Sequence, residues 1–371
     1  TRVVAGGTVH VAAGTYTENV TVNKDITLDG ATDPFGSTPA VVQGLITISA
    51  QGATVQDLKV TPGSVVGQVA AVSVYASNTT VSGNLIDGMV GDNTASIKGI
   101  FAYGGSTTAL ENITVSGNTI KNISNPGTLV KGTDGIQIQG NLIGVNVTNN
   151  IIQNISSQGW AFGIEVTPSG ANPTLPPQDV VIRGNTITNV SAVTYPGIAL
   201  SIDQYNAENT ADASKVTAEL NRFNALPVVN KDSAHSLNAE RNWWGSVTGP
   251  AAGQMVGDVK YLPYCTNAAC TTFSEAKLSM DPATINATTC GPQYVDVMVT
   301  DVADLTAYHL EVTFDRTKVK IDSVENLGLF AETSQHTVVV EPGTDLGNTT
   351  GRLKFGAMLQ AKGADGNPGP V

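Results

Sequence analysis

Side chains suited to sugar binding recur along four short phrases of the sequence. The phrases begin at Gly99-Ile100, Gly135-Ile136, Gly163-Ile164 and Gly197-Ile198. Because successive residues of a strand point to opposite sides, the isoleucines are predicted to face inward and the residues that alternate with them outward. Aromatic rings stack on sugars, and amides, hydroxyls and carboxylates hydrogen-bond to them. The predicted carbohydrate-binding face consists of Phe101, Tyr103, Gln137, Gln139, Glu165, Thr167, Ser201 and Asp203.

A complete catalytic set is not expected on this face, so we predict no catalytic residues and no enzymatic activity. A glycosidase needs two carboxyl groups about 5 to 9.5 Å apart. Asp134 and Glu165 differ by three strand positions and one coil, which separates them by roughly 11 Å. A lyase or epimerase needs a base and a group that neutralises a uronate, and we expect no cation at the centre of this face. The histidines, which fall elsewhere, are His10, His235, His309 and His336.

An asparagine-containing phrase recurs between these segments and indicates a repeat array. The recurring asparagines are Asn84, Asn118, Asn150, Asn185, Asn221 and Asn242, at spacings of 34, 32, 35, 36 and 21 residues. Three short strands per repeat, each with a period of two, are typical of one coil of a parallel β-helix. We expect about eight coils, a buried column formed by Ile100, Ile136, Ile164 and Ile198, and a ladder of stacked asparagine amides. Each ladder asparagine is predicted to adopt the left-handed conformation at a corner.

Motifs at the two ends of the array resemble those of a known family. Ala13-Gly14-Thr15-Tyr16-Thr17-Glu18-Asn19-Val20 resembles the opening coil of extracellular right-handed parallel β-helix proteins, and Asn242-Trp243-Trp244-Gly245 resembles the motif that closes their last coil. The resemblance covers about residues 1–270 and implies an all-β solenoid. The family includes lyases, epimerases, adhesins and inert stalks, so it implies a fold and not an activity. One of the two tryptophans is expected to plug the open end of the core.

The residue pattern of the sequence changes at about residue 277. The segment of residues 305–315, Leu-Thr-Ala-Tyr-His-Leu-Glu-Val-Thr-Phe-Asp, is similar to strands of cohesin-like, immunoglobulin-like β-sandwich domains. We therefore predict two domains, a β-helix with its closing segment at 1–270 and a sandwich at 277–371. The sandwich is expected to be incomplete, because the family would continue into closing strands beyond residue 359. Cohesins recognise dockerin modules, so the resemblance implies protein interaction.

Charge and cysteine content restrict the partners and the compartment. The net charge is −12, which would repel a polyanion such as nucleic acid. The sequence contains no run of about 18 apolar residues, so no membrane span is predicted. Cys265 and Cys270 are predicted to form a disulfide across a small loop, which favours a secreted, extracellular or cell-surface protein. A zinc site would need two more ligands nearby, and Cys290 is either buried and free or paired outside this chain.

Modification and cofactor sites give weaker signals. The motif Asn-x-Ser/Thr, the acceptor for N-linked glycans, occurs at Asn19, Asn78, Asn112, Asn122, Asn146, Asn154, Asn189, Asn286 and Asn348. We predict no cofactor and no metal ion. The nearest candidates for calcium, Asp301 with Asp304 or Asp365 alone, supply too few oxygen ligands at a fixed spacing.

Three functions are compatible with these features. The preferred one is a non-catalytic extracellular surface or assembly protein (filament, adhesin or surface-layer component), with a β-helix shaft and a sandwich that binds other proteins. Its copies are expected to contact one another end to end, because unpaired strand edges at the chain ends invite β-augmentation. The alternatives are a polysaccharide-active β-helix enzyme and a carbohydrate-binding adhesin.

Overall fold

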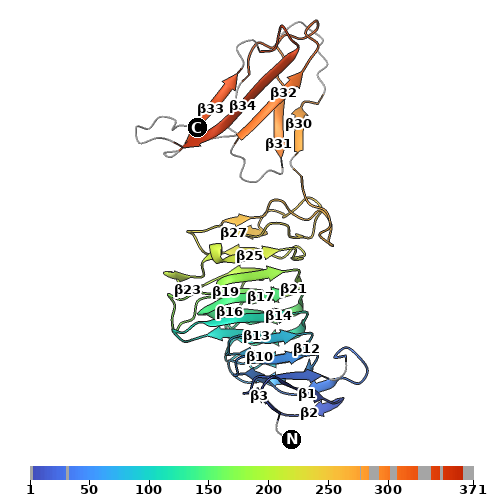
Figure 1. The fold of residues 1–371 in the computed structure, drawn as a ribbon, viewed down its shortest axis with the longest axis vertical. Coiled ribbons are helices and arrows are strands. Elements are labelled where there is room, and N and C mark those ends of the chain that lie inside the picture. Colours follow the sequence, from blue (N-terminus) through green and yellow to red (C-terminus); the bar gives the residue numbers. More distant parts are fainter. Residues whose placement is uncertain are drawn as a thin grey trace. The chain divides into compact units, whose positions relative to one another are not determined.

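A computed structural model describes residues 3–30, 33–275, 277–283, 292–300, 307–324, 336–342 and 346–361. The chain divides into two compact units, residues 1–301 and 302–371, and the first is an array of stacked coils (Figure 1). None of the described residues forms a helix with the length and hydrophobicity of a bilayer-spanning segment.

Three parallel sheets make up the first unit. A ten-stranded sheet contains β1 (Gly7–Val11), β4 (Ile26–Gly30), β7 (Thr54–Gln56), β11 (Thr80–Ser82), β14 (Leu110–Ser116), β17 (Leu142–Thr148), β20 (Gln178–Arg183), β25 (Val216–Glu219), β27 (Leu237–Asn238) and β29 (Val259–Lys260). A nine-stranded sheet contains β3 (Val20–Val22), β6 (Ile46–Ile48), β10 (Ala70–Val74), β13 (Ile97–Gly104), β16 (Thr133–Gly140), β19 (Ala161–Thr167), β22 (Gly197–Ile202), β26 (Val228–Asn230) and β28 (Met255–Val256). An eight-stranded sheet contains β2 (Gly14–Tyr16), β5 (Ala40–Val42), β8 (Lys59–Val60), β9 (Gly63–Val65), β12 (Leu85–Gly91), β15 (Thr119–Asn125), β18 (Ile151–Ser157) and β21 (Thr186–Ala192).

The chain visits the three sheets in turn, which is the topology of a parallel β-helix. Successive strands of each sheet come from successive coils, so β13 pairs in parallel with β16, and β16 with β19. One apolar cluster runs between the sheets from Val22 to Tyr264. The largest sheet has ten strands, more than the eight coils expected, because several strands near both ends are only two or three residues long and lack a clear periodicity.

The predicted isoleucine column is confirmed for three coils and wrong for the fourth. Ile100, Ile136 and Ile164 are fully buried and in register. In the next coil Leu200 pairs with Ile164, whereas Ile198 packs in a separate cluster outside the main core. Gly197-Ile198 therefore lies two residues earlier in its coil than the matching phrases, such as Gly163-Ile164, lie in theirs.

The asparagine ladder is present, although its backbone conformation differs from the prediction. Each of the six asparagines is fully buried, and each side-chain oxygen from Asn118 onward accepts from the backbone N–H and the amide of the asparagine one coil before. The left-handed residue is the one that precedes the asparagine, as at Gly83, Gly117 and Asn149. In four of the six coils the corner is thus turned by glycine or asparagine, which tolerate positive φ, and in the last two by Leu220 and Arg241.

The last coils are closed by an aromatic residue and a disulfide. Trp244 is buried and packs against Phe223 with ring centroids 5.2 Å apart, whereas Trp243 is half-buried. Cys265 and Cys270 form a disulfide, as predicted. Cys290 lies outside the described residues.

The described strands beyond the β-helix form two antiparallel sheets. A hairpin pairs β30 (Lys277–Asp281) with β31 (Asp296–Thr300) and belongs to the first unit. In the second unit β34 (Arg352–Ala361) lies between β32 (Ala307–Thr313) and β33 (His336–Pro342). These strands account for an antiparallel sheet, and the cohesin-like sandwich stays a prediction.

Candidate functional site

The strand register brings the predicted sugar-binding residues together on the outer side of the nine-stranded sheet. One column runs through Phe101, Gln137, Glu165 and Ser201 on successive strands. A second column contains Tyr103, Gln139 and Thr167, and Asp203 follows directly after the strand of the next coil. The eight predicted residues thus lie in two columns along one side of the sheet, and their role in sugar binding stays a prediction.

Most of this face is covered and not open to solvent. Six of the eight residues are buried, namely Phe101, Gln137, Glu165, Thr167, Ser201 and Asp203. Tyr103 and Gln139 are half-buried. An extended ligand therefore cannot lie along the whole face as the strands alone would allow, and access is confined to the part near Tyr103.

Lys98 also lies on the outer side, which corrects the expectation that the face has no cation. Its ammonium nitrogen lies 5.2 Å from the centre of the Phe101 ring, and it lines the pocket described below. Strict alternation from Ile100 would point residue 98 inward. The alternation breaks at Gly99, because Ile97 and Ile100 are both fully buried in the core although two residues separate them.

The glycine at this break has a steric reason. A Cβ at Gly99 would come within 2.5 Å of a carbonyl oxygen of the next coil and 2.6 Å of a core isoleucine methyl. Gly135 and Gly163, which follow in the next two coils, would meet comparable contacts. The residue before each glycine is therefore turned to the outer side, and in two coils that residue is ionisable: Lys98 and Asp134. The recurrence of glycine in the phrase was the signal that could have revealed them.

Buried carboxyl groups lie beside Lys98. Burial raises the pKa of Asp134 to about 7, although the charge of Lys98 opposes this shift and that of Asp203 adds to it. Burial also raises the pKa of Glu165 well above its usual value, with Asp134 and Asp203 contributing in the same direction. The amide of Gln137 donates a hydrogen bond to Glu165. Both carboxyls therefore hold protons at a pH where exposed carboxyls are ionised.

Asp203 differs from these two because it has a cationic partner. Its Oδ1 lies 2.6 Å from the Nζ atom of Lys231, and its Oδ2 accepts a hydrogen bond of 3.1 Å from the Ser201 hydroxyl. Lys231 follows the strand of the next coil and was not identified from the sequence. The pair anchors the far end of the face as a neutral, hydrogen-bonded unit.

Three polar atoms of β16 are buried without a hydrogen-bond partner in the described part of the chain. They are the Thr133 hydroxyl oxygen, Asp134 Oδ1 and Gln137 Oε1. Native structures leave few such atoms unpaired, and each one requires a physical explanation. The neighbourhood of Asp134 is therefore the chemically unusual part of this face.

An open pocket of about 560 Å³ adjoins this neighbourhood. Three aromatic rings define one side of it. Phe101 stacks on Tyr103 with centroids 5.2 Å apart, and Tyr75 meets both rings edge-on at 6.4 and 6.2 Å. Lys98 and Gln139 add polar groups to the lining. The volume lies within the range of small-molecule sites, which is about 300 to 1,000 Å³.

A loop after β19 holds the aromatic side in place. The Ser169 hydroxyl donates to the Tyr103 hydroxyl at 3.1 Å, and the Asn172 amide donates to the Gly105 carbonyl at 2.7 Å. These bonds join residues more than 60 positions apart in the sequence, so sequence periodicity could not have revealed them. They fix the rim of the pocket before any ligand arrives.

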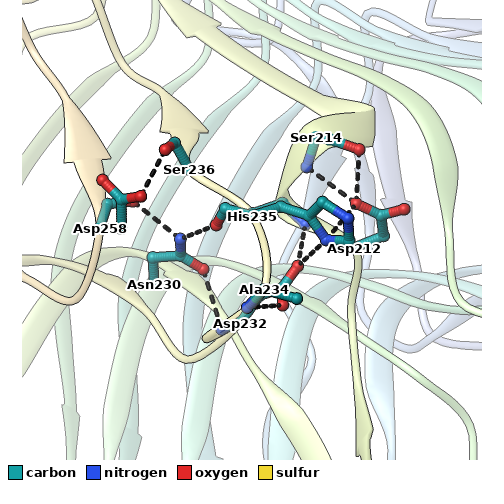
Figure 2. Close-up of polar contacts among 9 residues, drawn as sticks. Asp212, Ser214, Asn230, Asp232, Ala234, His235, Ser236 and Asp258 are labelled. Carbon is teal, nitrogen blue, oxygen red and sulfur yellow. Dashed lines mark hydrogen bonds and ion pairs between the residues drawn. The ribbon is translucent and has the colours of Figure 1, made fainter. Parts of the chain in front are cut away.

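A second polar cluster lies near the last coils, where Asp212, Asp232 and His235 converge (Figure 2). Ligand atoms of the three residues lie within 4.8 Å of one another, a spacing that a metal ion can bridge. Hydrogen bonds explain this arrangement without an ion. Asp212 caps the short 3₁₀ helix η1 (Ala213–Lys215), Asp232 accepts from two backbone N–H groups, and the His235 Nδ1 lies 2.9 Å from Asp232 and 3.3 Å from Asp212.

We expect this cluster to make stability depend on pH. The hydrogen bond to Asp232 and the charge of Asp212 raise the pKa of His235. Burial alone would raise the pKa of Asp232, but backbone hydrogen bonds lower it overall. A histidine whose pKa is higher in the folded than in the unfolded state stabilises the fold at pH values below its unfolded-state pKa. This stabilisation is lost as pH rises through the folded-state pKa. The stabilisation that the ionised Asp232 provides is lost at the other end of the range, as pH falls through its lowered pKa.

His235→Ala is therefore expected to lower the denaturation midpoint at about pH 5 and to change it little at about pH 9. Asp212→Asn removes one of the two carboxylates and should reproduce part of this difference. Chemical denaturation of the three proteins at both pH values provides the measurement. An equal loss at the two pH values would mean that His235 acts by packing alone.

The candidate glycan-acceptor asparagines have varied surroundings. Asn78, Asn112, Asn122, Asn154 and Asn189 are all left-handed, and the amides of the last four donate to an oxygen of the coil before. The Asn19 oxygen accepts from Leu45, Asn146 is exposed on β17, and Asn348 bonds to Ile321. Asn286 and the candidate calcium residues Asp301, Asp304 and Asp365 lie outside the described residues.

Comparison with known proteins gives no assignment. No protein-family model matches the chain, and no curated protein matches it. The resemblance to extracellular β-helix and cohesin-like proteins therefore stays a prediction from the motifs. Any functional conclusion must come from the pocket and the polar groups around it.

Proposed function

We propose that this chain is a non-catalytic carbohydrate-binding protein of the cell exterior, with a right-handed parallel β-helix as its shaft. The observation that carries the proposal is the aromatic side of the pocket formed by Tyr75, Phe101 and Tyr103. Sugar rings present apolar faces that pack on aromatic rings, and their hydroxyls require nearby polar groups. Gln139 and Ser169 line the same pocket and can provide these hydrogen bonds.

The geometry of the rings supports stacking by an incoming sugar. Tyr75 is 43% exposed although it meets two other rings edge-on, so part of its ring is available to a ligand. Phe101 is buried beneath and supports Tyr103 through a stacked contact. Because the loop at Ser169 fixes the Tyr103 hydroxyl, the platform loses little side-chain entropy on binding.

Binding without turnover is favoured by the position of the carboxyl groups. Asp134 and Glu165 are only 1% and 8% exposed, and neither lines the pocket. A glycosidase needs both carboxyls at the scissile bond, with one on either side of it. The cellular placement is supported by the disulfide between Cys265 and Cys270, a bond typical of oxidising compartments. The cohesin-like module and self-assembly remain proposals for the segment after the β-helix.

A polysaccharide-active enzyme is the second candidate, and one observation favours it. Asp134 has a pKa raised to about 7, which suits a general acid at neutral pH. Turnover of a glycan that vanishes in both Asp134→Asn and Glu165→Gln would establish this alternative. Retention of binding without any turnover in the native protein would favour the first.

Tyr103→Ala is expected to weaken glycan binding at least tenfold, or about 1.4 kcal/mol, because it removes a stacking ring. Tyr103→Phe keeps the ring and loses only the bond from Ser169, so its effect should be smaller. Tyr195→Ala is the matched control, since Tyr195 is 53% exposed and does not line the pocket. Isothermal titration with oligosaccharides found on a glycan array measures all three. Equal affinities for native protein and Tyr103→Ala would contradict a stacking role.

A further inference from the structure

We propose that the pocket selects glycans that carry an acidic group, a carboxylate or sulfate on the sugar ring, and that Lys98 pairs with this group. The inference rests on the proposed carbohydrate binding and names the class of sugar. Of the fourteen residues that line the pocket, Lys98 is the only lysine, arginine, histidine, aspartate or glutamate. The pocket thus presents one positive charge and no fixed negative charge.

Lys98 lacks a close counter-ion in the described part of the chain. No carboxylate there forms an ion pair with it within 4.0 Å, and its nearest polar contact is the Ser96 carbonyl oxygen at 3.5 Å. Lys98 is nevertheless only 3% exposed. An ammonium group removed from water without a counter-ion within 4.0 Å is unfavourable, so a ligand anion that reaches it gains an ion pair that the free protein does not make.

The carboxyl groups near Lys98 do not replace such a ligand below about pH 7. Asp134 is adjacent to Lys98 in the strand register, and Glu165 lies one coil further on. Asp134, whose pKa is raised to about 7, is mainly protonated below that pH, and burial raises the pKa of Glu165 well above its usual value. Asp203 pairs with Lys231, which leaves Tyr75 and Tyr103 as the other titratable groups facing the pocket. The charge of Lys98 is therefore free to act on a ligand.

The same arrangement predicts how acidic-ligand affinity varies with pH. As pH rises past about 7, Asp134 loses its proton and becomes a competing counter-ion for Lys98. Affinity for an acidic sugar should therefore fall over this range, whereas affinity for a neutral sugar should not. A bound anion would neutralise the charge of Lys98, which opposes protonation of Asp134. Ligand binding and proton uptake by Asp134 are therefore linked.

The overall charge restricts the type of acidic glycan. The chain carries a net charge of −12, so a dense polyanion is repelled outside the pocket. One acidic residue among neutral sugars avoids this repulsion and still reaches Lys98. We therefore expect mixed glycans with isolated acidic residues to bind better than uronic acid homopolymers.

The test uses matched ligands with the full chain. A glucuronic-acid-capped xylo-oligosaccharide is compared with its carboxyl-reduced form, and a sulfated galacto-oligosaccharide with its desulfated form. Native protein at about pH 6 should bind at least one acidic member tenfold or more tightly than its neutral counterpart. Lys98→Met should abolish this preference, so that the acidic and neutral members of each pair bind with similar affinity. Lys131→Met, which lies outside the pocket lining, is the control.

Each outcome bears on one proposal. Equal binding of acidic and neutral members by native protein overturns the acidic preference and leaves carbohydrate binding intact. Binding of neither pair, nor of any sugar on a glycan array, overturns the proposed function itself. Should Lys98→Met fail to fold, the preference of the native protein for acidic over neutral sugars is measured at about pH 6 and about pH 8.5. A preference that does not decline between these two pH values contradicts the role of Lys98 and Asp134.

Discussion

Asn150→Ala is expected to destabilise the β-helix by about 3 to 5 kcal/mol, one of the largest effects of any single substitution in this chain. The side chain of Asn150 takes part in four buried hydrogen bonds. It donates to the Val115 carbonyl and to the Asn185 oxygen, both at 2.9 Å. It accepts from the backbone N–H and the amide of Asn118 at 2.9 and 3.0 Å.

Alanine would leave buried partners in two neighbouring coils without a bond. The Asn118 N–H and the Val115 carbonyl cannot reach water, because the ladder asparagines are fully buried. Each orphaned buried group costs about 1 to 3 kcal/mol, so the sum exceeds the loss of an ordinary surface contact. The neighbouring amides also lose the ordered chain of donors that runs from coil to coil.

Asn146→Ala is the matched control for this experiment. Asn146 lies four positions earlier in the same coil, on β17, with an exposed side chain. We expect a change of about 0.5 kcal/mol or less there. Urea denaturation followed by circular dichroism measures both variants, and the midpoint shift is compared because a repeat array need not unfold in one step. Similar shifts for the two variants would show that the ladder does not hold the coils together.

Recurrence in the sequence was sufficient to predict the solenoid and the asparagine ladder. The ladder repeats at nearly fixed spacing because every coil must present an amide at the same height. The same reasoning predicted that Phe101, Gln137 and Glu165 share one column. These features depend on local alternation and on stacking between neighbouring coils, both of which appear in the sequence.

The ionisable groups of this face were harder to predict from the sequence, because their positions depend on breaks in the alternation of inward and outward residues. No cation was expected at the centre of the face, because strict alternation would point residue 98 inward, but the break in alternation at Gly99 turns Lys98 outward. Similarly, Ile198 resembles Ile164 in sequence but pairs two positions away from it, since β22 begins earlier in its coil. The loop at the rim of the pocket contacts Tyr103 from more than 60 residues away, and no periodic signal in the sequence indicates such a contact.

Trp244→Ala is expected to cost about 3 to 5 kcal/mol, because it opens the core at the last coils. Trp244 is 1% exposed and packs at a tilt of 60° against Phe223, which is fully buried. Its backbone carbonyl also accepts from Gln254 at 3.0 Å, a contact that the substitution keeps. The loss is therefore one of packing, with a cavity next to Phe223.

Two variants separate packing from other effects at this site. Trp244→Phe retains most of the apolar contact and removes an indole N–H that is buried without a partner in the described residues, so it should cost much less than alanine. Trp243→Ala removes a side chain of the same size that is only half-buried, and a smaller loss is expected there. Urea midpoints and intrinsic fluorescence of the three variants provide the comparison. If Trp243→Ala proved the more damaging, the plug of the core would have to be assigned to Trp243, with Trp244 a peripheral contact.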